Sequence, residues 1–409
     1  MVIALIVFIL VFVGLDVGIS LLNYNQRTQP LPTNVTGIYD EAAYSKWLAY
    51  SMEKLKLGLI QKAVFTVILV GFLGLGGFAW LNTFSESYST DPVLSTLIFI
   101  GAFMGLQLVV GLPFEWIDTF TIEAKYGFNK TTVKTFWIDQ LKGLVLGVVL
   151  GGAVLSLLVN LYQSFQDALL EFGIWAYVVL SILTLAMFVL SKVFVQVFNK
   201  LKPIDDLELK GKIDELASKC GFRVKSIYEM DASKRSTKLN GFYTGFGKVG
   251  EIVLYDTLIA KMSHEQILAV LAHELGHAKH KDTQKLLAIQ NGTLVYYIAL
   301  IVFILTMPGL FTHFGFEGVH FGFALILFSI LVEPLSLVLG IVRNALMRIA
   351  ETKADAYAVT MTSQATMGEV LKTLAAENFS NLNPHPLYVM IHYTHPPIAQ
   401  RLSDLQKAH

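Results

Sequence analysis

Apolar residues are grouped along this chain in long blocks and not in short alternating runs. Seven blocks of about 20 residues contain no Lys or Arg: 1–22, 63–82, 93–112, 143–163, 172–191, 286–310 and 321–342. An α-helix of that length crosses the ~30 Å hydrocarbon core of a bilayer. The pattern therefore predicts an α-helical integral membrane protein with seven transmembrane helices.

Basic residues fall only in segments that this topology places on one side of the membrane. All 31 Lys and Arg lie in four segments: 23–62, 113–142, 192–285 and the tail from 343. The connectors on the other side contain none: 83–92, 164–171 and 311–320. Because cytoplasmic loops retain Lys and Arg, the N-terminus is expected outside and the C-terminus in the cytoplasm. The first block lacks a basic n-region and an A-x-A-like cleavage site, so it is predicted to remain as a helix.

Composition agrees with a membrane protein, since hydrophobic residues make up 54% of the chain and charged residues 15%. A net charge of zero predicts no nucleic-acid partner. Cys220 is the only cysteine, so no disulfide is expected, which suits a reducing cytoplasm. The compact chain ends in QKAH without an ER-retrieval signal. We therefore favour a monomer in a bacterial cytoplasmic membrane, with an ER membrane as the alternative.

The blocks divide the chain into four parts. Residues 1–191 are predicted to form transmembrane helices 1–5 with their cytoplasmic loops, and residues 286–342 helices 6 and 7. Between them, residues 192–285 form a cytoplasmic catalytic insertion. The last part, 343–409, is a C-terminal catalytic segment.

The insertion is expected to combine helices with a small sheet. Apolar residues share one face of a helix over 204–219, and Gly221 is expected to cap its end. A short strand is predicted at 224–230. The stretches 240–246 and 251–258 flank GKVG as the strands of a hairpin.

The helix that follows carries the main chemical signal, LAHELGHAKH. It is predicted to begin at Ser263, with a capping box to Gln266. His273 and His277 are i and i+4, so their imidazoles project from one face and can bind one cation. Glu274 then stands where the H-E-x-x-H pattern requires a base that takes a proton from water. The pattern predicts a Zn²⁺ site for peptide hydrolysis.

A third ligand is needed to complete such a site. Position 283 is Thr, which excludes the metzincin arrangement with a third histidine. His280 and Asp282 are interpreted as solvated residues at the helix C-terminus. Glu351 and Asp355 are again i and i+4, so one carboxylate could bind the metal while the other braces an imidazole.

These motifs resemble the type I CaaX prenyl endopeptidases, a family of membrane zinc metalloproteases. HELGH and R-x-x-E-x-x-A-D at 348–355 carry the resemblance most specifically. FTIEAKYGFNKTTVKTFWIDQLK at 120–142, the hairpin region 231–258 and HYTHPPIAQRL at 392–402 follow in the family's order. The resemblance implies seven helices that enclose a water-containing intramembrane chamber, with a cytoplasmic gluzincin-like α+β protease domain.

The resemblance also implies roles for eight residues. They are the zinc ligands His273, His277 and Glu351, the general base Glu274, the ligand-bracing Asp355, the transition-state contacts His395 and Arg401, and Asn240 beside the substrate strand.

Three functions remain open on this reading. The leading one is a zinc endopeptidase that cuts near the C-terminus of prenylated CaaX-type or other hydrophobic membrane-associated peptides. The first alternative is a general quality-control protease for membrane proteins, which would use the same metal site. The second is a non-catalytic seven-span protein with a structural zinc, but Glu274 beside the ligands argues against it.

Two ionisable residues fall inside predicted spans, Asp16 in the first and Glu333, followed by Pro334, in the seventh. Such groups are costly in hydrocarbon, and the proline leaves a carbonyl without its partner. The chamber that the resemblance implies would hydrate both carboxylates. We therefore assign them to solvation or pairing and not to catalysis.

Overall fold

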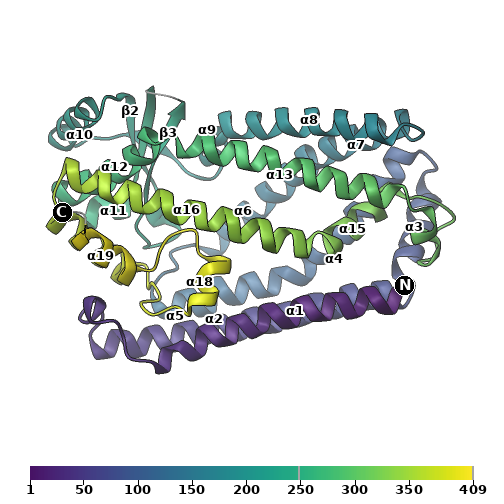
Figure 1. Cartoon of the computed structure of the whole chain (residues 1–409), viewed down its shortest axis with the longest axis horizontal. Helices are drawn as coiled ribbons and strands as arrows, with labels where there is room; N and C mark the ends of the chain where they lie inside the picture. The colour runs from purple at the N-terminus through teal and green to yellow at the C-terminus, as the bar shows by residue number, and fades with distance from the viewer. Residues whose placement is uncertain (247–248, 408–409) are drawn as a thin grey trace.

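Long helices dominate the structure. The computed structural model describes residues 1–246 and 249–407. The long helices run along the longest axis of the molecule, and a small α+β part lies at one end, where the C-terminus is also found (Figure 1). This arrangement confirms the predicted class, a helical membrane protein with an α+β part.

Six helical stretches are long and apolar enough to cross a membrane. They are α1 (Val2–Asn25) with the turn that follows it, α2 (Glu41–Gly74), α4 (Pro92–Trp116) continued to Tyr126 through α5 (Ala124–Tyr126), α6 (Val133–Leu146) continued into α7 (Gly152–Ser164), α8 (Leu169–Val189) and α13 (Asp282–Leu305). The pair α15 (Phe321–Leu331) and α16 (Glu333–Met361) makes a seventh if the two count as one span. A multi-pass membrane protein is thereby confirmed.

Two predicted spans differ from the observed helices. The block 63–82 is interrupted at Gly76, whose φ of +74° lets the chain turn before α3 (Gly77–Tyr88) begins. The block 321–342 is bent by 54° between α15 and α16. Pro334 lies in the first turn of α16, where a missing N–H is tolerated. Both breaks follow from residues that a count of apolar positions ignores.

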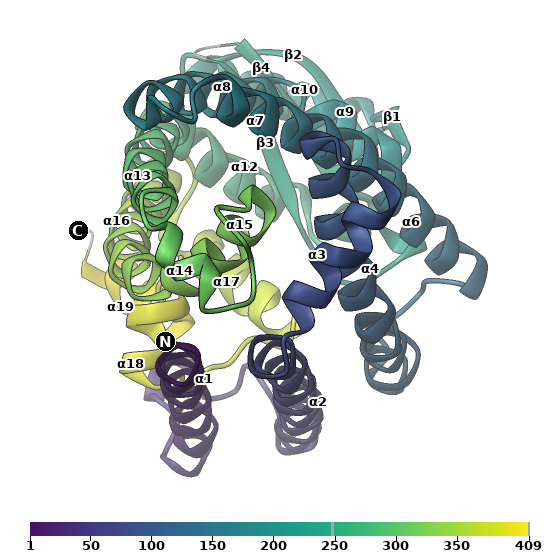
Figure 2. The same cartoon turned by 90° about the vertical axis from the view of Figure 1, so that its right-hand side faces the viewer.

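The helices stand around a central space when the bundle is viewed along its length, with α1 and α2 on one side and α8 and α13 on the other (Figure 2). Within this arrangement lies a cavity of about 830 Å³, lined by residues of α1, α2, α4, α15, α16 and α18 (Pro386–His392). We call it the membrane cavity. Its lining includes both Asp16 and Glu333.

The α+β part is built on a four-stranded mixed sheet with the order β1-β2-β4-β3. The strands are β1 (Leu201–Pro203), β2 (Arg223–Met230), β3 (Gly241–Phe246) and β4 (Val249–Tyr255). Strands β3 and β4 pair antiparallel, which confirms the predicted hairpin, although Gly247 and Lys248 of its turn lie outside the described residues. Among the residues that the structure describes, β3 is the last strand of the sheet, so one of its edges has no neighbouring strand.

Helices cover this sheet and make its core. The predicted helix 204–219 is α10 (Leu207–Lys219), and Gly221 has the expected left-handed φ of +80°. It packs with α11 (Asp256–Lys261), α12 (His264–Lys279), α17 (Gln364–Glu377) and α19 (Ile398–Lys407). Short α9 (Ser191–Phe198) and α14 (Pro308–Thr312) complete the helices.

Residues 120–142, one of the segments that resemble the CaaX prenyl endopeptidases, join the bundle to the α+β part. Arg235 forms two hydrogen bonds with Asp139, at 2.8 and 3.0 Å. Glu123 accepts a hydrogen bond from Tyr50 at 2.6 Å and pairs with Lys54 at 3.2 Å. These contacts are structural, so the segment serves the architecture of the bundle.

The proposed division of the chain into four parts stays a prediction. Helix α16 runs from Glu333 to Met361 and so passes without a break through the boundary between 286–342 and 343–409.

Candidate active site

Helix α12 presents the two histidines on a largely buried face. Its N-terminus has the predicted capping box: Gln266 N–H donates to the Ser263 hydroxyl, and Ser263 N–H donates to the Gln266 side chain. Gly276 faces α16, where a Cβ would come within 3.1 Å of the Cα of Ala354. The glycine therefore allows α12 and α16 to approach closely enough to share ligands.

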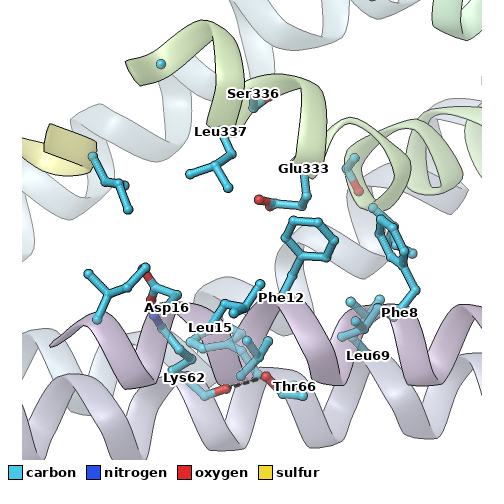
Figure 3. A pocket seen from close by; sticks show the side chains of 18 of the residues that line it. Phe8, Phe12, Leu15, Asp16, Lys62, Thr66, Leu69, Glu333, Ser336 and Leu337 are labelled. Carbon is cyan, nitrogen blue, oxygen red and sulfur yellow. Dashed lines mark hydrogen bonds and ion pairs between the residues drawn. The ribbon is translucent and has the colours of Figure 1, made fainter. Parts of the chain in front are cut away.

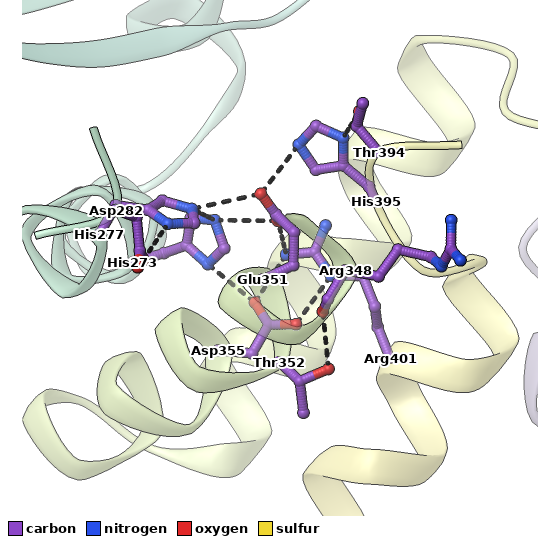
Figure 4. Close-up of polar contacts among 10 residues, drawn as sticks. All are labelled: His273, His277, Asp282, Arg348, Glu351, Thr352, Asp355, Thr394, His395 and Arg401. Carbon is purple, nitrogen blue, oxygen red and sulfur yellow. Dashed lines mark hydrogen bonds and ion pairs between the residues drawn. The ribbon is translucent and has the colours of Figure 1, made fainter. Parts of the chain in front are cut away.

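Helix α16 brings Glu351 to the same point (Figure 4). The Nε2 atoms of His273 and His277 are 3.2 Å apart. Glu351 Oε2 lies 3.4 Å from His273 Nε2, and its Oε1 lies 3.2 Å from His277 Nε2. The three side chains form the one group of metal-ligating residues found among residues 1–246 and 249–407.

This geometry fits zinc. Two zinc bonds of about 2.0–2.1 Å that meet near the tetrahedral angle hold their ligand atoms about 3.3 Å apart. The three observed distances match that separation. Glu351 is only 2% exposed, and its Oε2 accepts no hydrogen bond from the described residues. A buried carboxylate oxygen that accepts no hydrogen bond is suited to bind a cation.

Carboxylates brace both imidazoles from behind. Asp355 Oδ1 lies 2.8 Å from Nδ1 of His273, and Asp282 Oδ2 lies 3.1 Å from Nδ1 of His277. Arg401 donates two hydrogen bonds to Asp355, at 2.6 and 2.7 Å. Such partners fix the ring orientation of metal-bound histidines.

Asp282 corrects the sequence interpretation. The sequence predicts a solvated Asp282, but its side chain is only 13% exposed and contacts His277. The reason is the residue before it: Lys281 has a left-handed φ of 58°, so the chain turns after α12 and starts α13 at Asp282. His280 remains outside the metal group, with its ring 6.1 Å from that of Tyr357.

A cavity of about 410 Å³ adjoins the three-ligand group, and we call it the catalytic cavity. Glu274 and His395 both border it. Burial raises the pKa of the Glu274 carboxyl, which makes it a better proton acceptor than an ordinary glutamate. His395 Nε2 lies 3.1 Å from Glu351 Oε1, and its side chain is 58% exposed.

The predicted residues divide into those that border this cavity and those that do not. Arg401 is buried and does not border it; burial alone would lower the pKa of its guanidinium, but the hydrogen bonds to Asp355 raise it. Asn240 is also absent from the lining, and its carbonyl accepts a hydrogen bond from Tyr255 N–H. The neighbouring strand β3 lines the cavity from Phe242 to Gly245.

Two further residues, Arg348 and Asn344, hold the segment that precedes His395; Arg348 begins the R-x-x-E-x-x-A-D motif, whereas Asn344 was not singled out in the sequence. Arg348 donates to the carbonyls of Val389 and Tyr393, at 3.1 and 2.6 Å. Asn344 donates to the carbonyl of Ile391 at 2.6 Å. Both lie one or two turns before Glu351 on α16, so helical spacing was the signal that could have identified them.

Comparisons with known proteins agree with this site. The family model described as "CAAX prenyl protease N-terminal, five membrane helices" matches residues 20–200, and that of peptidase family M48 matches residues 203–409. An Arabidopsis thaliana relative, "CAAX prenyl protease 1 homolog", is 33% identical over 91% of this chain and 89% of its own. "Probable CAAX prenyl protease 1" of Schizosaccharomyces pombe is 31% identical over 93% and 83%.

A solved structure shows the same fold along the whole chain. The crystal structure of S. mikatae Ste24p has a TM-score of 0.93 with 26% identity, over 99% of this chain and 98% of that one. The family model, the relatives and the three converging ligands all agree with an integral-membrane metalloendopeptidase whose cofactor is zinc. The chain belongs to peptidase family M48 and, within it, to the CAAX prenyl proteases of type 1.

Proposed function

We propose that this protein hydrolyses a peptide bond near the C-terminus of prenylated, CaaX-type membrane-associated proteins. The observation that carries the proposal is the group of His273, His277 and Glu351, whose ligand atoms lie at zinc-like distances beside a cavity at one end of a membrane bundle. The relatives named CAAX prenyl proteases support the substrate class.

The chemistry follows from the residues around the group. Zinc, when held by His273, His277 and Glu351, supplies Lewis-acid activation of water and of the peptide carbonyl. Glu274, with its raised pKa, takes the proton of the attacking water and passes it to the leaving amide nitrogen. His395 borders the cavity, and we expect it to donate a hydrogen bond to the carbonyl oxygen as negative charge develops there.

The remaining polar residues of the site act through the two histidines that would bind zinc. Asp355 and Asp282 hold the two imidazoles, and Arg401 holds Asp355. The geometry supports this bracing role for Arg401 more than a direct contact with the substrate, because both of its hydrogen bonds go to Asp355.

The substrate peptide is expected to lie along β3. This strand ends the sheet and lines the catalytic cavity with Phe242 to Gly245. An extended peptide can pair with such an edge through backbone hydrogen bonds, which serve many sequences equally. Asn240 precedes this edge, so a role in substrate pairing stays a prediction for it.

The membrane arrangement completes the proposal. With the bent pair α15 and α16 counted as one span there are seven spans, and the position of the basic residues then predicts an N-terminus outside and a catalytic end in the cytoplasm. The enzyme is proposed to act as a monomer in lipid. The choice between a bacterial cytoplasmic membrane and an ER membrane stays a prediction, and the relatives named above come from eukaryotes.

Replacing Glu274 by Gln tests the proposal. The variant should retain its zinc but lose at least about 10²-fold of its activity on a farnesylated CaaX peptide, because the proton acceptor is gone. Glu265→Gln, in the exposed first turn of the same helix, is the matched control. Retained turnover in Glu274→Gln would reject the assigned base.

The same assay separates the proposed function from its alternatives. Equal cleavage of the farnesylated peptide, its unprenylated form and an unfolded membrane protein would favour a quality-control protease. Bound zinc without hydrolysis of any of the three would favour a structural zinc site.

A further inference from the structure

A narrow groove between α13 and α16 has no part in the mechanism above. The two helices lie side by side in both views of the bundle (Figures 1 and 2). The groove holds about 150 Å³ and is formed by residues within 282–289 of α13 and within 343–353 of α16. We call it the interhelical groove.

The groove lies where two apolar blocks of the sequence end. Lys285 directly precedes the block 286–310, and Arg343 directly follows the block 321–342. Because α13 and α16 are neighbours, these two changes from apolar to basic sequence predict a single membrane boundary. Lipid phosphates are found at the same boundary.

The groove lies on the outer side of α16. The inner side of this helix borders the membrane cavity, where Glu333 and Leu337 face α1 and α2 (Figure 3). Leu346 and Ile349 line the groove but neither the membrane cavity nor the catalytic cavity. They are 45% and 52% exposed, so their side chains face the bilayer.

Positive charge gathers in the groove. Its lining contains Lys285, Arg343 and Lys353 but one carboxylate, that of Asp282, so three cations against one anion leave an excess of two. Asp282 Oδ1 lies 3.0 Å from the Lys285 ammonium, while its Oδ2 contacts His277. Arg343 and Lys353 pair with no carboxylate among residues 1–246 and 249–407. These two cations can therefore bind an anion from outside the chain.

The rest of the groove is apolar. Leu286 and Ile289 of α13 and Met347 of α16 line it together with the bilayer-facing side chains. A free anion would gain nothing from these residues, whereas a phospholipid can place its phosphate by the cations and its acyl chains along the apolar part.

We propose that the interhelical groove binds an anionic phospholipid, with the phosphate at Arg343, Lys353 and Lys285. The excess of positive charge favours a lipid with a net negative charge over a zwitterionic one, whose ammonium group the same cations repel. The site is separate from the peptide substrate, so this proposal does not depend on the proposed function.

A lipid bound here would join the two helices that hold the metal group. Asp282 and Ala350 line both the groove and the catalytic cavity. Asp282 braces His277 from α13, and Ala350 directly precedes Glu351 on α16. The lipid is therefore expected to hold α13 and α16 together beside the metal group.

The test uses zinc-loaded full-length protein that has been stripped of lipid in detergent. Native mass spectrometry measures the dissociation constants of dioctanoyl phosphatidylglycerol, of phosphatidylcholine with the same chains, and of inorganic phosphate. We expect phosphatidylglycerol to bind at least about ten-fold more tightly than phosphatidylcholine, because several cations contribute. Inorganic phosphate should bind more weakly than either lipid, since it lacks acyl chains.

Two variants locate the site. Arg343→Gln and Lys353→Gln should each reduce the preference for phosphatidylglycerol by about five-fold, the contribution of one basic residue near a membrane surface. Lys134→Gln is the matched control, because Lys134 is exposed in the first turn of α6 and borders none of the three cavities described above. Zinc content and helicity are measured for every variant.

Three results would overturn the proposal. The first is equal binding of the two lipids to the unmodified protein, which needs no variant to fold. The second is a preference that stays the same in Arg343→Gln and Lys353→Gln, or that falls as much in Lys134→Gln. The third is inorganic phosphate that binds as tightly as phosphatidylglycerol, which would indicate an anion site without lipid.

Discussion

Helix α16 carries charged groups in two surroundings that differ sharply. Towards its C-terminus, Asp355 accepts two hydrogen bonds from Arg401, and the side chains are 5% and 11% exposed. Towards its N-terminus, Glu333 faces the membrane cavity together with the Asp16–Lys62 pair, whose side chains are each 36% exposed. One end of the helix holds its charges in a packed network and the other leaves them beside open space.

The contrast separates two ways of keeping charge inside a membrane protein. In the packed network each charge is desolvated, so its stability depends on one specific partner. In an open cavity, water can solvate the charges, so a partner matters little. The metal group needs the first arrangement, because its ligands must stay in fixed positions.

The largest effect is expected from Glu351→Gln. The loss of the carboxylate charge should release most of the zinc and reduce hydrolysis by at least about 10³-fold, since Lewis-acid activation contributes several kcal/mol. Zinc content and cleavage of a farnesylated peptide measure both effects. Glu369→Gln, at an exposed position of α17, is the control, and zinc retained at the native level in Glu351→Gln would contradict the ligand assignment.

The second effect concerns the packed network itself. Arg401→Leu leaves Asp355 buried without its charge partner, so the free energy of unfolding should fall by about 3–5 kcal/mol. Denaturant unfolding in detergent measures the loss. Adding Asp355→Leu should recover part of it, because the unpaired charge is then removed. A single variant as stable as the native protein would show that the pair is not desolvated.

The part of the site that depends on short helical spacing could be predicted from the sequence. His273 and His277 are four residues apart on one helix, so their convergence needs no tertiary information. Spacing alone suggested that one of the carboxylates Glu351 and Asp355 binds the metal and the other braces an imidazole. The resemblance to the CaaX prenyl endopeptidases assigned the ligand role to Glu351 and the bracing role to Asp355.

Other features depend on backbone geometry or packing that the sequence does not display. Asp282 reaches His277 only because Lys281 adopts a left-handed conformation, which a non-glycine residue seldom does. The resemblance implies a transition-state contact for Arg401, which stays a prediction; the packing of α19 against α16 adds hydrogen bonds from Arg401 to Asp355 that the sequence does not display. The break at Gly76 and the bend before Glu333 interrupt apolar runs that looked continuous.

A smaller effect is expected for Asp282, because it acts only through His277. Asp282→Asn should weaken zinc binding by about 10–100-fold, as losses of such bracing carboxylates do. Competition with a zinc chelator measures this without reference to turnover. Lys281→Gly is the informative companion, since it keeps the left-handed turn and should bind zinc normally. An unchanged zinc affinity in Asp282→Asn would show that Asp282 does not brace His277.

The smallest effect is expected at the membrane cavity. Lys62→Met breaks the pair with Asp16, yet the free energy of unfolding should change by less than about 1 kcal/mol if water reaches the cavity. Denaturant unfolding of Lys62→Met, Asp16→Asn and the double variant forms a cycle that isolates the energy of the pair. A loss comparable with that of Arg401→Leu would mean that the cavity is dry. The two ends of α16 would then hold their charges in the same way.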